Sequence, residues 1–458
     1  MGAPPTAVTP SPAAPSAPDR AIPDRAAPDL LPADATWETR DVPPTTAGGT
    51  LGAPDQRGVT PPPRVRRGVW QRVRAVLFWL HLAAGVAAGA VILAMSATGV
   101  VLAYQRQVTE WVLARQRPAD APAARLPLDT LVARAVGRVP AGMQFTGVTR
   151  RSDAEAPVAV AFEGQGPGVA RRTVWVDPAT GRVLAGSPGL QAFFAGTERV
   201  HRSFMIGRGI RSPEGAAVTG AANLAFFFLL LSGLYLWVPR RWTRRAVRAV
   251  ALPVRGVRGR ARDWNWHHVM GLWAAPGLLV VVGSAAFLSY KWPEQWVARA
   301  AGVPPAAEGR GRPAPAIGAP AGPQTRASLD TLAARALAAS GTTGAWYSVQ
   351  LRLPRPDAPA EIAATVSTAR ALRPDRRSTV TLDAATGAVV RQQGYVDLDA
   401  GRRARGWARF LHTGEAFGAP GQTVAMLVSL AGAGLVWTGI ALALRRLGRA
   451  LGGRRAAT

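Results

Sequence analysis

The residues with the clearest capacity for chemistry are the chain's five histidines, His81, His201, His267, His268 and His412. Each lies within or close to a long apolar segment. Ionisable side chains in apolar surroundings are costly to desolvate, so their presence there indicates a function. Neutral imidazole is a frequent metal ligand, and haem iron is commonly held by histidine. These residues therefore point to haem sites at the ends of membrane-spanning segments.

Composition narrows the classes of protein that need to be considered. The 55 lysines and arginines outnumber 27 acidic residues, which gives a net charge of +28 and by itself would suggest nucleic acid. However, the densest arginine runs flank apolar segments, where membrane topology explains them, so we expect no nucleic-acid partner. The absence of cysteine excludes disulfides, iron–sulfur clusters, thiolate zinc sites and covalently attached haem. Any haem must be held non-covalently, as haem b.

Four segments are long and apolar enough to cross a bilayer, which takes about 20 residues. They cover residues 75–104, 216–238, 266–290 and 423–444. In lipid the backbone must satisfy its own hydrogen bonds, so each segment is predicted to be a helix. The expected fold class is an α-helical membrane protein with four transmembrane helices.

Arginine placement predicts the orientation of these helices. Clusters lie at 64–74, 240–262 and 445–455. Basic residues gather on the cytoplasmic side of membrane proteins. We therefore expect a multi-pass protein of a bacterial inner membrane with both termini in the cytoplasm, a basic cytoplasmic loop at 239–263 and a basic tail at 445–458. Residues 1–66, rich in proline and alanine, are predicted to be a disordered cytoplasmic leader.

Two long segments, 105–200 and 291–411, are then predicted to lie outside the membrane as small α+β domains. Each contains an amphipathic helix, alternating apolar runs typical of strands, and an Asp-x-x-Thr-Gly turn. Glycine at the end of this turn would supply a positive φ. The predicted helices cover 128–135 and 329–336, the strands include 157–162, 173–177 and 379–383, and the turns are 177–181 and 383–387.

The two halves of the chain resemble each other. His81 to Tyr104 aligns with His267 to Tyr290 without a gap, which pairs Gly85 with Gly271. Short histidine segments, 201–215 and 412–422, precede the second and fourth spans. Each half is therefore predicted to consist, in order, of a spanning helix, an external domain, a histidine segment and a second spanning helix. Because each unit crosses the membrane twice, we expect two parallel repeats.

This topology sorts the histidines into two couples. His81 and His267 begin inward-to-outward spans near the cytoplasmic face, whereas His201 and His412 precede spans that begin at the outer face. We therefore predict two haems, each held by one histidine from each repeat. His268 falls outside the repeat alignment and is expected to be a propionate partner or supporting residue, although it could replace His267 as the inner ligand.

Other residues could support the haems. Gly85 and Gly271 lie four residues beyond His81 and His267, on the same helix faces, where small side chains could admit a flat macrocycle or simply allow close helix packing. Arginines around His201 could hold haem propionates or an anionic substrate, or be interfacial charges. Met205 and Met270 are possible sixth ligands, although methionine on helices usually packs. The arginines in question are Arg199, Arg202, Arg208 and Arg211.

At these residues the chain resembles the PepSY-associated transmembrane family of bacterial inner-membrane proteins. The resemblance covers about residues 70–447. The motifs that carry it are Leu80-His81 with Gly85, Val200-His201-Arg202-Ser203, Leu231-Ser232-Gly233-Leu234-Tyr235-Leu236-Trp237, His267 with Gly271-Leu272-Trp273-Ala274-Ala275-Pro276, Phe410-Leu411-His412-Thr413-Gly414-Glu415-Ala416-Phe417-Gly418, and the turn Val176-Asp177-Pro178-Ala179-Thr180-Gly181.

The resemblance implies a four-span di-haem protein with two periplasmic PepSY domains, similar to reductases of ferric siderophores. Some relatives carry a fused flavoprotein reductase, and this sequence contains no nucleotide-binding fingerprint that would indicate one. We therefore expect an external cytoplasmic electron donor and a periplasmic acceptor such as a ferric siderophore.

Two other functions are open at the level of sequence. The chain could be a regulatory or binding protein whose PepSY domains restrain a periplasmic peptidase, which would not need His201 or His412. It could also be a component of an iron or haem transporter. That function would favour carboxylates inside the spans, and the four predicted spans contain none.

Overall fold

The computed structural model describes residues 69–117, 124–164, 171–185, 188–207, 212–239, 242–303, 326–341, 345–354, 360–370 and 373–455. The predicted leader, 1–66, lies outside the described residues. So do Arg208, Arg211 and parts of the arginine clusters at 64–74 and 240–262.

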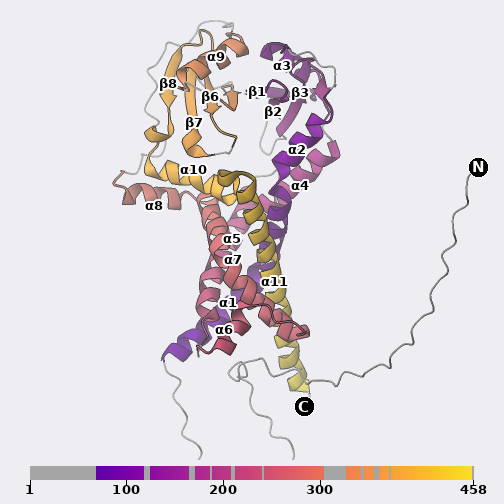
Figure 1. Ribbon diagram of the computed structural model, residues 1–458, viewed down its shortest axis with the longest axis vertical. Helices are drawn as coiled ribbons and strands as arrows, with labels where there is room; N and C mark the ends of the chain where they lie inside the picture. Colours follow the sequence, from indigo (N-terminus) through magenta and orange to yellow (C-terminus); the bar gives the residue numbers. More distant parts are fainter. Residues whose placement is uncertain are drawn as a thin grey trace, which may run out of the picture. The chain divides into compact units, whose positions relative to one another are not determined.

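Four long apolar helices form the membrane part of the protein (Figure 1). They are α1 (Val69–Leu102), α5 (Pro213–Trp237), α7 (Gly259–Ser289) and α11 (Gly418–Arg455). Each includes a stretch long and apolar enough to cross a bilayer, so the prediction of four such helices is confirmed and the protein is a multi-pass membrane protein. A short turn after α1 leads into α2 (Gln105–Ala114).

The four helices pack as a bundle. Helix α1 packs against α5 and α11, and α7 packs against the same two helices, so α1 and α7 occupy opposite corners. The bundle core is apolar and contains Ile92 of α1, Phe226 of α5 and Leu278 of α7. Small residues allow close approach, as where Gly432 of α11 faces Ser96 of α1.

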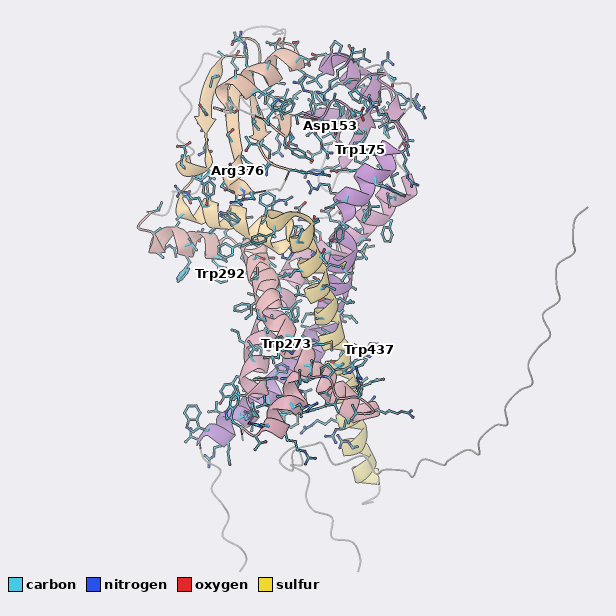
Figure 2. The ribbon with its side chains drawn as sticks, viewed as in Figure 1. Asp153, Trp175, Trp273, Trp292, Arg376 and Trp437 are labelled. Carbon is cyan, nitrogen blue, oxygen red and sulfur yellow. The ribbon has the colours of Figure 1, made fainter. Side chains whose placement is uncertain are left out.

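Exposed tryptophans lie toward both ends of the bundle. Figure 2 shows Trp292 at the end next to the sheet, and Trp273 and Trp437 toward the other end. All three are more than half exposed, at 55%, 68% and 67%. Amphipathic indole rings favour the interface between lipid and water. The positions of these tryptophans along the bundle therefore fit the two edges of a bilayer.

The two external segments together form one antiparallel eight-stranded sheet of order β4-β3-β2-β1-β5-β6-β7-β8. The first segment supplies four strands and the second supplies the other four. Their bounds are β1 (Met143–Arg151), β2 (Val158–Gly164), β3 (Arg171–Val176), β4 (Val183–Leu184), β5 (Ser348–Arg352), β6 (Glu361–Ser367), β7 (Arg377–Asp383) and β8 (Val389–Gln393).

The two sets of strands meet where β1 pairs with β5, from Gly147 opposite Arg352 to Arg151 opposite Ser348. A bulge in β1 lies between Phe145 and Gly147. A Cβ atom at Gly147 would lie 2.5 Å from the Leu351 carbonyl oxygen, so only glycine permits this approach. The sequence predicted three of these strands, β2, β3 and β7, but not that the two segments share a sheet.

One face of the sheet packs against two helices, α3 (Leu128–Val136) and α9 (Leu329–Ala339), in a single apolar core. Side chains alternate between the faces. Val174 and Val176 are buried in this core, whereas Trp175 between them belongs to the other face and lines a cavity. Because α3 and α9 cover only one face of the sheet, the other face is free to form a cavity wall.

The two predicted turns are confirmed. Asp177 Oδ1 accepts the Thr180 amide at 2.8 Å, and Gly181 adopts a φ of +67°. Asp383 Oδ1 accepts the Thr386 amide at 2.8 Å, and Gly387 adopts a φ of +70°. The hydrogen bonds from Thr386 hold the pKa of Asp383 below its usual value because they stabilise the ionised carboxylate.

Shorter helices connect the sheet to the bundle. Helix α4 (Pro188–Ser203) packs against α1 and α5, while α10 (Ala400–His412) packs against α7 and α8 (Trp292–Ala300). Asp399 caps α10 by accepting the Arg402 amide at 2.8 Å. The remaining short helix, α6 (Arg244–Ala251), contacts α7.

Candidate functional site

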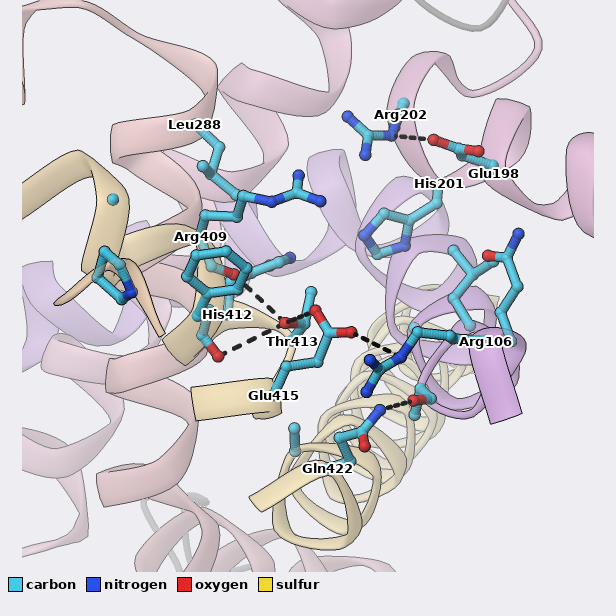
Figure 3. A pocket seen from close by; sticks show the side chains of 18 of the residues that line it. Arg106, Glu198, His201, Arg202, Leu288, Arg409, His412, Thr413, Glu415 and Gln422 are labelled. Atoms are coloured by element: carbon cyan, nitrogen blue, oxygen red, sulfur yellow. Dashed lines mark hydrogen bonds and ion pairs between the residues drawn. The ribbon is translucent and has the colours of Figure 1, made fainter. Parts of the chain in front are cut away.

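His201 and His412 come together from the two connecting helices. His201 lies in the last turn of α4, and His412 is the last residue of α10. Their ring centroids are 6.2 Å apart, with an angle of 54° between the ring planes. Both residues line the same pocket (Figure 3). The structure therefore brings together the two histidines that the sequence assigned to the outer couple.

Helix α1 fixes the orientation of the His201 ring. Nδ1 of His201 lies 3.0 Å from the Met95 carbonyl oxygen and 3.0 Å from the Thr98 hydroxyl oxygen. A carbonyl oxygen can only accept, so Nδ1 must carry the proton. In a neutral ring, Nε2 then has a free lone pair. This is the form in which imidazole binds metals.

His412 is held in the same way by α7. Its Nδ1 donates to the Val281 carbonyl oxygen at 2.9 Å, which again leaves Nε2 unprotonated in the neutral ring. Each ring of the outer couple is therefore oriented by a different transmembrane helix. A backbone carbonyl that fixes the imidazole tautomer is a typical supporting contact of a metal-binding histidine.

Burial favours the neutral form of both rings. Burial, followed by the charges of His412 and Arg202, lowers the pKa of His201 to about 4. Burial likewise lowers the pKa of His412, although its bond to Val281 acts in the opposite direction. Both imidazoles are therefore neutral at physiological pH and available as ligands.

His81 of α1 bonds to a hydroxyl on the neighbouring α5. The distance from His81 Nδ1 to Ser232 Oγ is 2.8 Å. Ser232 Oγ also lies 2.7 Å from the Phe228 carbonyl oxygen, which takes its single proton. The hydroxyl must therefore accept from Nδ1, and Nε2 of His81 keeps its lone pair.

The same arrangement recurs on the other side of the bundle. His267 Nδ1 lies 3.0 Å from Thr438 Oγ1 of α11, and this hydroxyl donates to the Gly434 carbonyl oxygen at 2.8 Å. His267 thus occupies in α7 the place that His81 occupies in α1. The two inner histidines have matching partners, although each comes from a different half of the chain.

A glycine next to each hydroxyl makes room for each inner ring. A Cβ atom at Gly233 would lie 3.3 Å from His81 Cε1, and one at Gly439 would lie 3.4 Å from His267 Cε1. The predicted supporting glycines have other neighbours. A Cβ atom at Gly85 would meet Leu229 at 3.8 Å, and one at Gly271 would meet Leu435 at 3.7 Å. In the structure, Gly85 and Gly271 therefore serve helix packing.

His268 has a different environment from His267. Its Nδ1 donates to the Trp264 carbonyl oxygen at 2.9 Å, and its ring lies 4.1 Å from the Trp264 ring. The centroids of His267 and His268 are 6.3 Å apart. His268 is thus close to the inner site but lacks the hydroxyl and glycine that His81 and His267 share.

The two methionines considered as sixth ligands make no described contact with the histidines of the couples. Met270 Sδ faces α11, 2.9 Å from the position of a Cβ at Gly434. Met205 is 52% exposed and follows α4 with a φ of +62°. Within the described ranges, no group of three or more His, Asp or Glu residues is arranged to hold a metal ion.

The outer couple opens into a cavity of about 1660 Å³. Trp175, Thr365 and Thr379 line it from the free face of the sheet. Ile92 and Phe226 line its deep end within the bundle. His81 and His267 do not belong to it. A ligand in the cavity could therefore contact the sheet and the outer histidines together.

Arginines dominate the charge of this cavity, and several are paired. Arg202 Nε lies 2.8 Å from Glu198, and Arg106 Nε lies 3.6 Å from Glu415 (Figure 3). Arg202, predicted to support the outer couple, therefore lines the cavity in an ion pair. Arg199 instead donates to the Gly207 carbonyl oxygen at 3.0 Å.

The family model described as PepSY-associated TM region matches residues 78–446. The chain belongs to this family. Among curated proteins, none matches the chain. The matched region contains all five histidines, the whole sheet, α5, α7 and most of α1 and α11, so the candidate site lies within the region that defines the family.

Sequence reasoning missed Ser232, Gly233, Thr438 and Gly439. A signal for them existed, since a hydroxyl residue followed by glycine occurs at matching places in the second and fourth spans. The carbonyl acceptors at Met95 and Val281 carry no signal, because every residue type presents a carbonyl oxygen.

Proposed function

We propose that the protein relays single electrons across the bacterial inner membrane through two non-covalent b-type haems, from a cytoplasmic donor to a periplasmic acceptor such as a ferric siderophore. His81 and His267 would hold the inner haem, and His201 and His412 the outer haem. Bound haem would supply reversible one-electron chemistry at its iron. The observation that carries this proposal is the shared arrangement of four imidazoles, each with Nδ1 bonded and Nε2 free.

The outer couple has dimensions that fit a haem iron. Metal-to-imidazole bonds are about 2 Å long, so two rings on opposite sides of one metal have centres about 6 Å apart. The centroids of His201 and His412 are 6.2 Å apart. The cavity at these rings exceeds the roughly 1,000 Å³ of a large ligand pocket, so it has room for a macrocycle and for an acceptor.

The inner couple is supported by its matching partners. A hydroxyl that accepts from Nδ1 fixes the ring and increases the basicity of Nε2. Ser232 and Thr438 both act in this way, and the adjacent glycines leave room beside each ring. Since His267 and not His268 has this environment, we assign His267 as the inner ligand and His268 as a neighbouring supporting residue.

The wider architecture supports a path between the two sides of the membrane. We infer that the halves are parallel repeats and that the two sets of four strands are PepSY domains joined through β1 and β5. By the positive-inside rule, arginines of α6 and of the end of α11 belong on the cytoplasmic side. The sheet and its cavity would then face the periplasm, where a ferric chelate could reach the outer site.

Reduction would release iron because ferrous ion binds hard oxygen ligands more weakly than ferric ion does. The chain's own residues would bind and orient the acceptor at the cavity wall. Ile92, Phe226 and Leu278 give the part of the cavity within the bundle an apolar lining, which a bound macrocycle would cover.

Haem quantification on purified full-length protein tests the proposal. We expect two haems per chain from pyridine haemochrome spectra. Alanine at any one of His81, His201, His267 or His412 should reduce this number to one. His268→Ala also removes a buried imidazole, but from a supporting residue and not a ligand, so this variant should retain both haems while holding the inner one less tightly.

A colourless protein from cells with ample haem would contradict the proposal. So would full haem content in all four ligand variants. Loss of haem in His268→Ala together with full retention in His267→Ala would overturn the assignment of the inner ligand only.

A further inference from the structure

The guanidinium groups of two arginines in the cavity lie close to the same aromatic ring. Arg377 is the first residue of β7, and Arg409 lies in the last turn of α10. Both line the cavity of the outer couple. Their guanidinium carbons lie 5.8 Å and 5.7 Å from the centroid of Phe410, which is 3% exposed. The buried ring thus keeps two positive charges at one part of the cavity wall.

Among the residues that the structure describes, no carboxylate lies within ion-pair distance of either guanidinium group. Arg106, Arg202 and Arg405, which line the same cavity, each form an ion pair. By contrast, Arg377 and Arg409 form no ion pair with any described residue. In addition, Nε of Arg377 is buried without a hydrogen-bond partner in the described parts of the chain. A buried donor with no acceptor is costly, so an anion bound at this position would stabilise the Arg377 guanidinium group.

The two halves of the protein differ at this point. Three residues before His201 the chain has Glu198, which pairs with Arg202. Three residues before His412 it has Arg409 instead. The carboxylate that balances charge on one side of the cavity is therefore replaced by a second arginine on the other.

The electrostatics favour binding of an anion between the two arginines. Burial, followed by the charge of Arg409, lowers the pKa of Arg377, while Glu415 acts in the opposite direction. A guanidinium group stays protonated in proteins, so the repulsion persists. An anion bound between the two groups would relieve both the repulsion and the desolvation of Arg377.

We propose that Arg377 and Arg409 form a carboxylate-binding subsite in the wall of the cavity, next to His412. Guanidinium groups match carboxylates because two parallel N–H donors face two oxygens. The carboxylate would come from one of two sources, a propionate of the outer haem or a carboxylate of an anionic ferric chelate. The choice of source rests on the proposed function, whereas the subsite itself rests on the unpaired arginines.

Titration of purified full-length protein with citrate, and separately with ferric citrate, tests this inference by calorimetry at low salt. Arg377→Gln and Arg409→Gln keep much of the side-chain volume but remove the charge. Each should weaken binding by about tenfold or more, since a charge-assisted hydrogen bond is lost. Arg391→Gln is the matched control, because Arg391 is an exposed residue of neighbouring β8 outside the cavity. It should bind as the wild type does.

Haem content and the reduction potential of the outer haem, measured on the same samples, distinguish the two sources. Weaker citrate binding with unchanged haem content and potential supports a subsite for the acceptor. Absent citrate binding in the wild type, with a lowered haem content or shifted potential in both glutamine variants, supports a propionate subsite. Wild-type citrate affinity, haem content and potential in both variants would overturn the inference.

Two further measurements protect the test against misfolding of the variants. Arg377→Lys and Arg409→Lys keep the charge but lose the two-pronged geometry, so they should fold and show intermediate citrate affinities. In the wild type, added salt should weaken citrate binding, and the uncharged triamide of citric acid should not bind. Citrate binding by a protein that contains no haem would refute the proposed function and leave the subsite intact.

Discussion

The four proposed ligands differ in how their Nδ1 protons are held. His201 and His412 both contact backbone carbonyls, of α1 and α7, although the Thr98 hydroxyl also lies beside His201. The inner rings donate to the hydroxyls of Ser232 and Thr438. A carbonyl acceptor cannot be removed by substitution, but a hydroxyl can. The inner couple is therefore the place where the role of ring orientation is open to direct test.

Ser232→Ala and Thr438→Val should each weaken inner haem binding, because the imidazole loses the bond that fixes its tautomer. Supporting contacts of this kind are worth about 10- to 100-fold in metal affinity. Haem retention during dilution, followed by absorbance, measures the change. The expected result is loss of one haem at about tenfold higher protein concentration than in the wild type.

Thr423→Val is the control for this experiment. It removes a hydroxyl from the same helix α11, but this hydroxyl bonds to Tyr104 and not to a histidine. Haem retention equal to that of wild type in Ser232→Ala and Thr438→Val would show that the hydroxyls do not support the ligands.

At the level of residues, sequence reasoning succeeded where chemistry stood out from its surroundings. Histidines within or close to apolar segments are such a case, and the structure brings the rings of His201 and His412 together. For Gly85 and Gly271, which were chosen by their position on the histidine's own helix, the sequence left haem support and close helix packing open, and in the structure both glycines face leucines of a neighbouring helix. The space beside each inner ring is provided by Gly233 and Gly439, which lie on neighbouring helices. A single segment of sequence does not specify which residues of two helices face each other, so this contact could not be predicted.

Among the elements, α3 and α9 hold each other through their first turns. Asp330 of α9 accepts the amide of Leu128, the first residue of α3, at 2.6 Å. Asp129 of α3 accepts the amide of Leu329, the first residue of α9, at 2.8 Å. Each aspartate thus caps the N-terminus of the other helix, where free amides and the helix dipole favour a negative charge. This exchange ties the two four-stranded sets together on the helical side.

Asp129→Ala and Asp330→Ala should each destabilise the junction by about 1 kcal/mol, which is the usual cost of a lost helix cap. Hydrogen–deuterium exchange measures this locally. Amides of β1 and β5, where the two sets of strands meet, should exchange several-fold faster.

Glu163→Ala serves as the comparison, because it removes a carboxylate from an ion pair whose side chains are 40% and 66% exposed. Exposed pairs contribute little, so its exchange rates should match those of the wild type. Unchanged protection of β1 and β5 in both aspartate variants would refute a role for the exchanged caps.

The elements themselves were predictable because their signals are local. Apolar runs gave the four spanning helices, and the Asp-x-x-Thr-Gly pattern gave the turns with positive φ at Gly181 and Gly387. Pairing of β1 with β5 depends on contacts between strands about 200 positions apart in the sequence. No local sequence pattern specifies such a pairing, so the sequence did not predict that all the strands form a single sheet.

For the whole molecule, the arrangement of helices explains why two couples can form. Helices α1 and α7 carry the inner histidines from opposite corners of the bundle, and each also orients one outer histidine. The same two helices therefore link the two proposed haem sites mechanically. The sheet adds a wall with exposed polar residues and arginines, which suits an acceptor that arrives from water.

The most direct test of electron relay uses the protein in sealed lipid vesicles with ferricyanide trapped inside and dithionite added outside. Neither reagent crosses lipid, and the orientation of the protein does not matter. Haem-loaded wild type should reduce the trapped ferricyanide far faster than empty vesicles do, and His81→Ala or His201→Ala should abolish the difference. Haem-loaded wild-type vesicles that react no faster than empty ones would contradict the account.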